Sequence, residues 1–187
     1  MIYFFNGMPE GGPLVMRVVE DSALSGPDGM PGVLALSWDE LPAQLPYSGF
    51  TFLGGRNAAE QLTLPLLKQA KSADDLRQFQ LTFRHKGMNE RSSMPLSLSV
   101  GCRVEPLLAD SYAKRLDLGT FTATGQWGTF EMAFAQGTNS EAFLRAIADE
   151  NPRGFKIVWS QVASLASYRP GDTLLIDDIV VTNSAAK

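Results

Sequence analysis

Two adjacent aspartates, Asp177 and Asp178, lie in the apolar segment LLIDDIVV near the end of the 187-residue chain. A carboxylate is costly to remove from water unless it is paired with a cation, hydrogen-bonded or bound to a metal. Successive side chains of a strand point to opposite faces, so only one of the two can serve a given site. The segment therefore predicts either a metal ligand or a carboxylate held by an arginine or by backbone amides.

A second kind of chemistry comes from aromatic side chains outside the apolar runs. Tyr47, Tyr112 and Tyr168 lie among Pro, Ser, Arg and Gly, which indicates loops, and Trp127 is out of phase with the apolar residues that follow it. Flat rings with a polar tip bind the C–H face of sugars, while polar groups beside them bind the hydroxyls. We therefore take these four residues as candidate ligand contacts, with a purely structural role as the alternative for Trp127.

Polar residues of the alternating segments could complete such a site. Arg84, His85 and Arg103 are expected on or near the polar faces of predicted strands. On a concave sheet they would line a cleft, whereas on a convex sheet they would be solvated, and we expect His85 to face solvent. We take Arg84 and His85 as further ligand candidates.

Motifs of known enzymes are missing from the sequence. His85 is the only histidine, no serine is marked as its partner, and the chain contains no G-x-S-x-G, H-E-x-x-H or G-x-G-x-x-G motif. The adjacent aspartates point apart on a strand, which is unsuited to the paired carboxyl groups of a glycosidase. We therefore expect a non-catalytic protein.

Length and charge narrow the class further. A chain of this length forms one domain, and its net charge of −4 without a basic stripe argues against nucleic-acid binding. The sequence holds no apolar run of 18 residues, so no membrane span is expected. Its start also lacks the basic and long apolar regions of a secretory signal. The single cysteine, Cys102, cannot form an internal disulfide and is in phase with a core face.

Period-2 alternation recurs along the chain and is clearest in QFQLTFRH, where Phe79, Leu81 and Phe83 share one face. Such alternation places one face on the core and one in water. Many short alternating strands separated by turn residues are typical of a β-sandwich or barrel. One helix is predicted near 139–150, where Thr138 and Glu141 have the spacing of a capping box.

The order of the segments GVLALSWDE, YSGFTFLGG, ADDLRQFQLTFRHKG, TGQWGTFEMAF, PRGFKIVWS and GDTLLIDDIVV resembles a galactose-binding-like jelly roll. Among such folds it is most similar to family 11 carbohydrate-binding modules and the related complex I assembly-factor family. The most specific motifs are TGQWGTF and LLIDDIVV. The resemblance covers about residues 14–183 and implies one domain over 1–187: an all-β, two-sheet antiparallel sandwich with one short helix in a connection.

The resemblance also implies a structural calcium. In such modules an aspartate of the last strand binds the ion together with an acidic residue near the first strand. The matching positions here are Asp177, with Glu20 or Asp21. Calcium takes 6 to 8 oxygen ligands, so backbone carbonyls would supply the others.

Finally, the resemblance implies a function. It indicates a binding module that recognises a glycan, extracellular or periplasmic if the resemblance holds, although this chain shows no signal peptide. The alternative is a jelly-roll interaction or structural domain of a larger protein, with a protein partner. A glycan site needs exposed aromatic rings that converge with polar groups, whereas a protein-binding surface needs a flat apolar patch.

Overall fold

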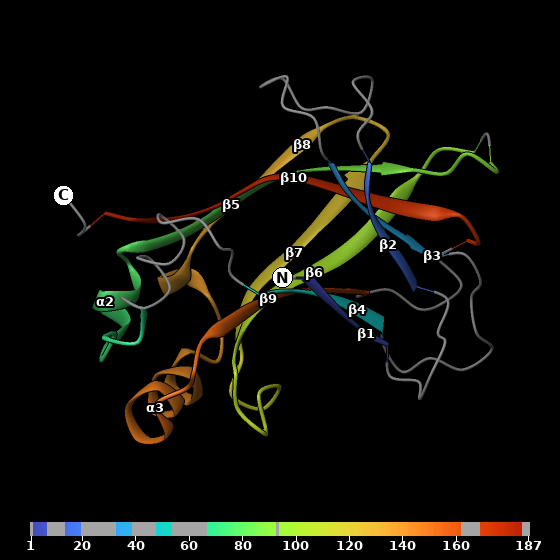
Figure 1. Cartoon of the computed structure of the whole chain (residues 1–187). Helices are drawn as coiled ribbons and strands as arrows, with labels where there is room; N and C mark the ends of the chain where they lie inside the picture. Colours follow the sequence, from blue (N-terminus) through green and yellow to red (C-terminus); the bar gives the residue numbers. More distant parts are fainter. Residues whose placement is uncertain are drawn as a thin grey trace.

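Two five-stranded antiparallel sheets, packed face to face, make up the part of the chain that the computed structural model describes (Figure 1). The described residues are 2–6, 14–19, 33–38, 48–53, 67–92, 94–161 and 169–184. Sheet A consists, in spatial order, of β1 (Ile2–Asn6), β4 (Ser48–Leu53), β9 (Phe155–Gln161), β6 (Ser97–Pro106) and β7 (Leu116–Thr124). Sheet B consists of β2 (Leu14–Val19), β3 (Val33–Trp38), β10 (Asp172–Asn183), β5 (Phe79–Met88) and β8 (Gly128–Ala133). The predicted two-sheet jelly-roll sandwich is confirmed.

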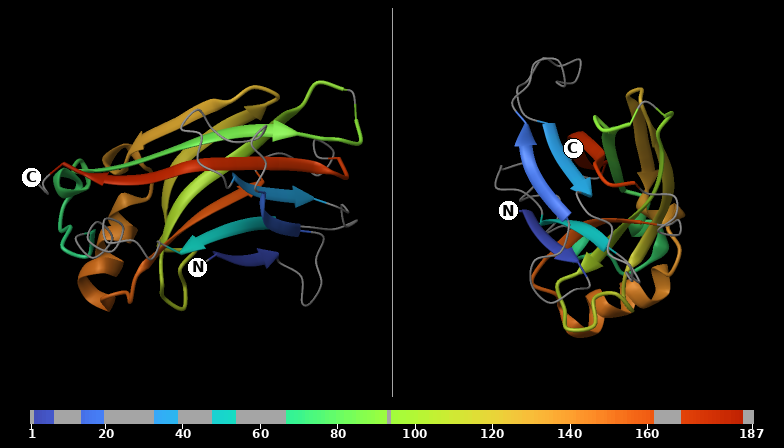
Figure 2. Two further views of the ribbon diagram at one scale, coloured as in Figure 1. Left: turned by 45° about the horizontal axis from the view of Figure 1, so that its top comes forward. Right: turned by 90° about the vertical axis from the view of Figure 1, so that its right-hand side faces the viewer.

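The core lies between the sheets and follows the predicted alternation. Phe79, Leu81 and Phe83 of β5 are buried, while the residues between them are only partly buried. The Phe83 ring stacks on Phe130 of β8, with centroids 4.8 Å apart, and meets the Trp159 ring of β9 edge-on at 5.5 Å. Aromatic pairs at these separations add to the stabilisation from buried area, so this cluster joins the two layers shown in both views of Figure 2.

The predicted helix is present as α3 (Ser140–Glu150), but its N-terminus differs from the prediction. The N-cap is Asn139, in a left-handed conformation with φ 65°, and it makes no side-chain capping bond, so the capping box expected at Thr138 is wrong. A one-turn helix, α2 (Ala73–Leu76), carries a capping box formed by its own N-cap and third residue. Four residues are too few for helical periodicity to be read from sequence. A 3-10 turn, η1 (Phe134–Gln136), follows β8.

Two strands lie outside the predicted pattern. β1 precedes residue 14, where the resemblance begins, and pairs with β4. β7 is not predicted from the sequence because it contains a bulge. Its register with β6 shifts between Cys102 and Arg103, and Gly119 has φ +107°. The buried residues of β7 consequently change from even to odd positions, which breaks the alternation in the sequence. No helix in the described ranges is both long enough and apolar enough to span a bilayer.

Candidate functional site

The outward face of sheet A, away from the core, is hollowed into a cavity of about 340 Å³. This volume is in the range of roughly 300 to 1,000 Å³ typical of small-molecule sites. Its lining comes from β6, β7 and β9, from the β6–β7 connection (107–115), and from the residue before the N-cap of α3. The residues are Gly101, Cys102, Arg103, Tyr112, Arg115, Asp117, Gly119, Thr120, Thr138 and Ser160. We call this hollow the sheet-A cleft.

Small residues on adjacent strands create the hollow. Gly101 of β6 lies opposite Ser160 of β9 on one side and Thr120 of β7 on the other. Gly119, next along β7, is exposed, and its φ of +107° is one that side-chain-bearing residues rarely adopt. Because neither glycine has a side chain, the sheet surface is low at this point, and larger side chains stand around it.

Tyr112 lines the cleft and lies close to two guanidinium groups. The Cζ atom of Arg115 lies 4.0 Å from the centroid of the tyrosine ring, and that of Arg103 lies 5.2 Å from it. Arg115 Nη1 also donates a hydrogen bond to the backbone oxygen of Tyr112, at 2.8 Å. The tyrosine nevertheless remains 52% exposed. A large flat ring is therefore held beside the hollow by cation–π contacts while much of its area stays accessible.

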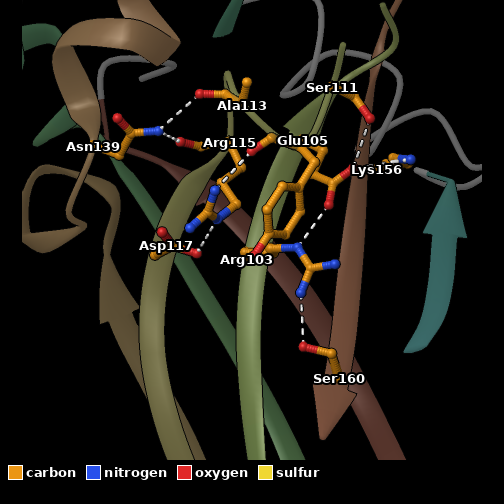
Figure 3. Close-up of polar contacts among 10 residues, drawn as sticks. Arg103, Glu105, Ser111, Ala113, Arg115, Asp117, Asn139, Lys156 and Ser160 are labelled. Atoms are coloured by element: carbon orange, nitrogen blue, oxygen red, sulfur yellow. Dashed lines mark hydrogen bonds and ion pairs between the residues drawn. The ribbon is translucent and has the colours of Figure 1, made fainter. Parts of the chain in front are cut away.

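A buried ion-pair network forms the β6 side of the cleft (Figure 3). Arg103 and Glu105 are two residues apart on one strand and so share a face. Arg103 Nε donates to Glu105 Oε1 at 2.6 Å, and Arg103 Nη1 donates to Ser160 Oγ at 2.7 Å. The other carboxylate oxygen, Glu105 Oε2, accepts from Ser111 Oγ at 2.8 Å and lies 2.9 Å from Lys156 Nζ.

The electrostatics of Glu105 follow from this network. Its side chain is 3% exposed, and this burial raises the pKa of the carboxyl group. The hydrogen bonds from Arg103, Lys156 and Ser111 act in the opposite direction and outweigh burial, so the pKa of Glu105 lies below its ordinary value. Glu105 is thus an ionised, fully engaged group that fixes the guanidinium group of Arg103 against the cleft.

The loop that carries Tyr112 is fastened to the N-terminus of α3. Asn139 Nδ2 donates to the carbonyl oxygens of Arg115, at 2.8 Å, and Ala113, at 3.2 Å. Asp117 and Thr138 exchange two backbone hydrogen bonds of 2.9 and 3.1 Å. Sequence reasoning missed Asn139 because its partners are 24 and 26 residues away. Its position before an apolar-periodic segment indicated only a helix start.

The two predicted aromatic candidates that lie within the described residues, Tyr112 and Trp127, do not converge on one site. Tyr112 lies in the sheet-A cleft, whereas Tyr47 and Tyr168 lie outside the described residues. Trp127 and Arg84 belong to the outward face of sheet B, where the arginine Cζ lies 4.7 Å from the indole centroid. Trp127 also packs against a small buried apolar cluster formed by β3 and β10. A layer of core separates this pair from the sheet-A cleft, so it cannot act with Tyr112.

His85 is buried, and the expectation that it faces solvent is wrong. Its side chain is 6% exposed, its ring lies 4.4 Å from that of Phe121, and it packs over Gly128. The inward alternation of β5 continues through position 85, which places the imidazole in the core with the phenylalanines before it. Burial lowers the pKa of His85, and within the described residues its Nδ1 atom has no hydrogen-bond partner. The ring therefore does not reach the cleft.

Asp177 is half-buried and lies opposite Arg84 in the pairing of β10 with β5. The backbone N–H of Asp178 donates to Asp177 Oδ1 at 3.0 Å, at a bulge where Asp178 has φ 50°. Within the described ranges, no three His, Cys, Asp or Glu side chains come together as metal ligands. The other predicted ligands, Glu20 and Asp21, lie outside those ranges. The described residues alone do not form a calcium site, and calcium binding stays a prediction.

The closing strand does contain a fully buried carboxylate, but it is Asp172. Asn89 Nδ2 donates to Asp172 Oδ1 at 2.7 Å, and the backbone N–H of Arg169 donates to Oδ2 at 2.7 Å. The Arg169 side chain lies nearby, with Nε 3.7 Å from Oδ1. These contacts compensate the buried charge. Asp172 therefore joins the start of β10 to the end of β5.

No protein-family model and no curated protein matches the chain. Among solved structures, the N-terminal CBM22-1–CBM22-2 tandem domain of Paenibacillus barcinonensis Xyn10C matches with a TM-score of 0.50 and 14% identity, over 92% of this chain and 43% of that one. A CBM4 structure matches at 0.48 with 10% identity, over 97% and 86% of the two chains. The CBM22-1 xylan-binding domain of the same Xyn10C matches at 0.48 with 10% identity, over 100% and 87%.

The match to the CBM22 tandem agrees with the two-sheet topology: the chain has a jelly-roll fold of the kind found in carbohydrate-binding modules. The chain spans less than half the length of that tandem. The narrower resemblance to family 11 modules and to complex I assembly factors stays a prediction.

Proposed function

We propose that the chain is a non-catalytic domain, similar to carbohydrate-binding modules, that binds a glycan in the sheet-A cleft. The observation that carries the proposal is the half-exposed Tyr112 ring at the edge of a hollow floored by Gly101 and Gly119. A sugar bound there would contact the exposed part of the ring, and the arginine, carboxylate and hydroxyl groups of the lining would bind its hydroxyls. Its fold is one that carries such sites in other proteins, which is support by analogy.

The cleft chemistry favours binding over catalysis. Among the described residues, its lining contains one carboxylate, Asp117, whose Oδ1 accepts a 2.8 Å hydrogen bond from Arg115 Nε. Glycoside hydrolysis instead uses two carboxyl groups about 5 to 9.5 Å apart across the scissile bond. The buried Glu105 is already engaged by three donors and does not line the cleft.

The distribution of exposed apolar side chains gives less support to the alternative function, the binding of a protein partner, than the cleft gives to glycan binding. The exposed large apolar side chains of the described residues are Met94, Leu107, Tyr112 and Val180. They come from the β5–β6 connection, the β6–β7 connection and β10, so they do not follow one face. Protein-binding surfaces usually present a contiguous apolar patch.

Affinity electrophoresis in native gels that contain single soluble polysaccharides tests the proposal. The panel combines β-glucans, xylans, mannans, pectin and alginate. We expect at least one polysaccharide to retard the protein and Tyr112→Ala to abolish the retardation. Val180→Ala is the matched control, because Val180 is similarly exposed but belongs to sheet B. Its mobility should equal that of the wild type.

The stability of Tyr112→Ala separates lost binding from lost folding. The ring makes two partly exposed cation–π contacts, each worth roughly 0.5 to 1 kcal/mol. The expected cost of about 1 to 2 kcal/mol lowers the Tm by roughly 2 to 8 °C for a chain of this size, so the variant remains folded at room temperature. Failure of every polysaccharide to retard the wild type, or equal retardation of Tyr112→Ala, would contradict the proposal.

A further inference from the structure

We infer that the sheet-A cleft is selective for acidic glycans, with Arg115 and Arg103 binding the carboxylate of a uronic acid. This inference rests on the proposed glycan binding and adds the chemical class of the sugar. Its starting point is charge. Among the described residues, the charged side chains that line the cleft are Arg103, Arg115 and Asp117, two cations against one carboxylate. The whole chain, by contrast, has a net charge of −4.

The hydrogen-bonding capacity of the two arginines also favours an acidic ligand. Arg103 uses Nε for Glu105 and Nη1 for Ser160, and Arg115 uses Nε for Asp117 and Nη1 for the carbonyl oxygen of Tyr112. The Nη2 group of each arginine makes no hydrogen bond to the described residues. Guanidinium N–H groups bind carboxylates with charge-assisted hydrogen bonds, about twice as strong as neutral ones.

The two cations are also correctly placed relative to the ring. Both guanidinium Cζ atoms lie against the same Tyr112 ring, at 4.0 and 5.2 Å from its centroid. A sugar that contacts the exposed part of that ring therefore lies next to both arginines. Figure 3 shows Arg103 on β6 and Arg115 immediately before the adjacent strand β7. Each guanidinium group is already fixed by two hydrogen bonds. Little side-chain freedom would be lost on binding, which favours affinity.

The test compares each of three uronate polysaccharides with its own carboxyl-reduced, neutral form: alginate, polygalacturonate and glucuronoxylan. Affinity electrophoresis with the wild type is run at 0.01 M and 1 M NaCl, between which the screening length falls from about 30 to about 3 Å. We expect at least one uronate polymer to retard the protein, its reduced form to have no effect, and 1 M NaCl to remove the retardation.

Variants then assign the effect to the cleft. Arg115→Gln should weaken retardation about tenfold or more, the factor that corresponds to 1.4 kcal/mol. Arg115→Lys keeps the charge without the planar fork and should restore part of it. Arg77→Gln is the matched control: it removes one positive charge from the exposed Arg77–Asp74 pair beside α2 and should bind as the wild type does. Melting curves confirm that each variant is folded.

Four outcomes would overturn the inference. Equal retardation by a uronate polymer and its reduced form, or retardation by neutral polysaccharides alone, would remove the acidic preference and leave glycan binding intact. Retardation by κ-carrageenan but by no uronate polymer would assign the anion to sulfate esters instead of carboxylates. A protein that no neutral or acidic polysaccharide retards would lose both the inference and the proposed function.

Discussion

Glu105→Gln tests whether the buried ion-pair network holds the sheet-A cleft together. The substitution keeps the shape of the side chain but removes its charge. Arg103 and Lys156 would then face each other without the carboxylate that they share. Ser111 donates to Glu105 Oε2, the oxygen that Lys156 also contacts, so in the variant the serine and the lysine would compete for a neutral acceptor. We therefore expect the variant to be less stable and its Tyr112 loop less ordered.

The magnitude follows from the burial of the three groups. Removing one partner of a buried ion pair costs about 3 to 5 kcal/mol. Lys156 is 21% exposed, so solvent screens part of its contribution, and the lower end, about 3 kcal/mol, is expected. For a chain of this size each kcal/mol shifts the Tm by about 2 to 4 °C. Differential scanning calorimetry at pH 7 should therefore show a Tm lower by roughly 6 to 12 °C.

The pH dependence gives an independent check. Because the pKa of Glu105 is lower in the folded protein than in the unfolded chain, its ionised form stabilises the fold above the unfolded value of about 4.5. That contribution disappears as the pH falls through the folded pKa. The difference in Tm between the wild type and Glu105→Gln should therefore shrink when calorimetry is repeated at progressively lower pH.

Glu141→Gln is the control for Glu105→Gln, since it neutralises a well-exposed ion pair with Arg145 on α3. Exposed pairs of this kind contribute at most about 0.5 kcal/mol, so its Tm should fall by no more than about 2 °C. A Glu105→Gln variant that melts like this control at pH 7, or whose deficit persists unchanged in acid, would refute the reasoning.

Three further predictions concern the core, the histidine and calcium. Leu81→Ala truncates a fully buried side chain of β5 and should cost about 2 to 5 kcal/mol in chemical denaturation; a smaller loss would mean that the strand phase is wrong. Because burial lowers the pKa of His85, the unfolded chain binds a proton more readily, and the wild-type Tm should fall as the pH drops below about 6.5. His85→Phe should flatten that slope, and an unchanged slope would exclude His85 as its cause. If calcium binds, a hundredfold excess over its Kd adds about 2.7 kcal/mol, and EDTA should lower the wild-type Tm by roughly 5 to 11 °C but leave Asp177→Ala unaffected. Identical wild-type melting curves in calcium and EDTA would remove the metal.

The fold was predictable because it rests on local patterns. The period-2 alternation of β5, and of β6 as far as Cys102, reappears as alternating burial. Cys102, in phase with the core, is a buried thiol whose pKa burial raises. The prediction failed where backbone geometry interrupts the pattern. The bulge at Gly119 concealed β7, and the four-residue α2 is shorter than the window in which a helical period can be recognised.

The candidate site was only partly predictable because its members come together through sheet pairing. Tyr112 could be selected from its type and its loop setting, and Arg103 from its polar phase. The sequence gives no local signal of function for Gly101 and Gly119, which form the floor of the cleft, or for Asn139, which holds the Tyr112 loop. The position of the buried carboxylate in the closing strand was also predicted wrongly. The sequence drew attention to Asp177, whereas the fully buried carboxylate of the closing strand is Asp172, which looks like an ordinary turn residue after Gly171.

The most direct test of glycan binding in the sheet-A cleft is an amide NMR titration of the wild type with an oligosaccharide cut from a polysaccharide that retards it. The account predicts that the largest chemical-shift changes cluster at Gly101, Gly119, Thr120 and Ser160, on the floor and rim of the cleft. Tyr112→Ala should abolish these changes under the same conditions. Changes confined to sheet B, around Trp127 and Arg84, or no changes at saturating oligosaccharide, would contradict the account.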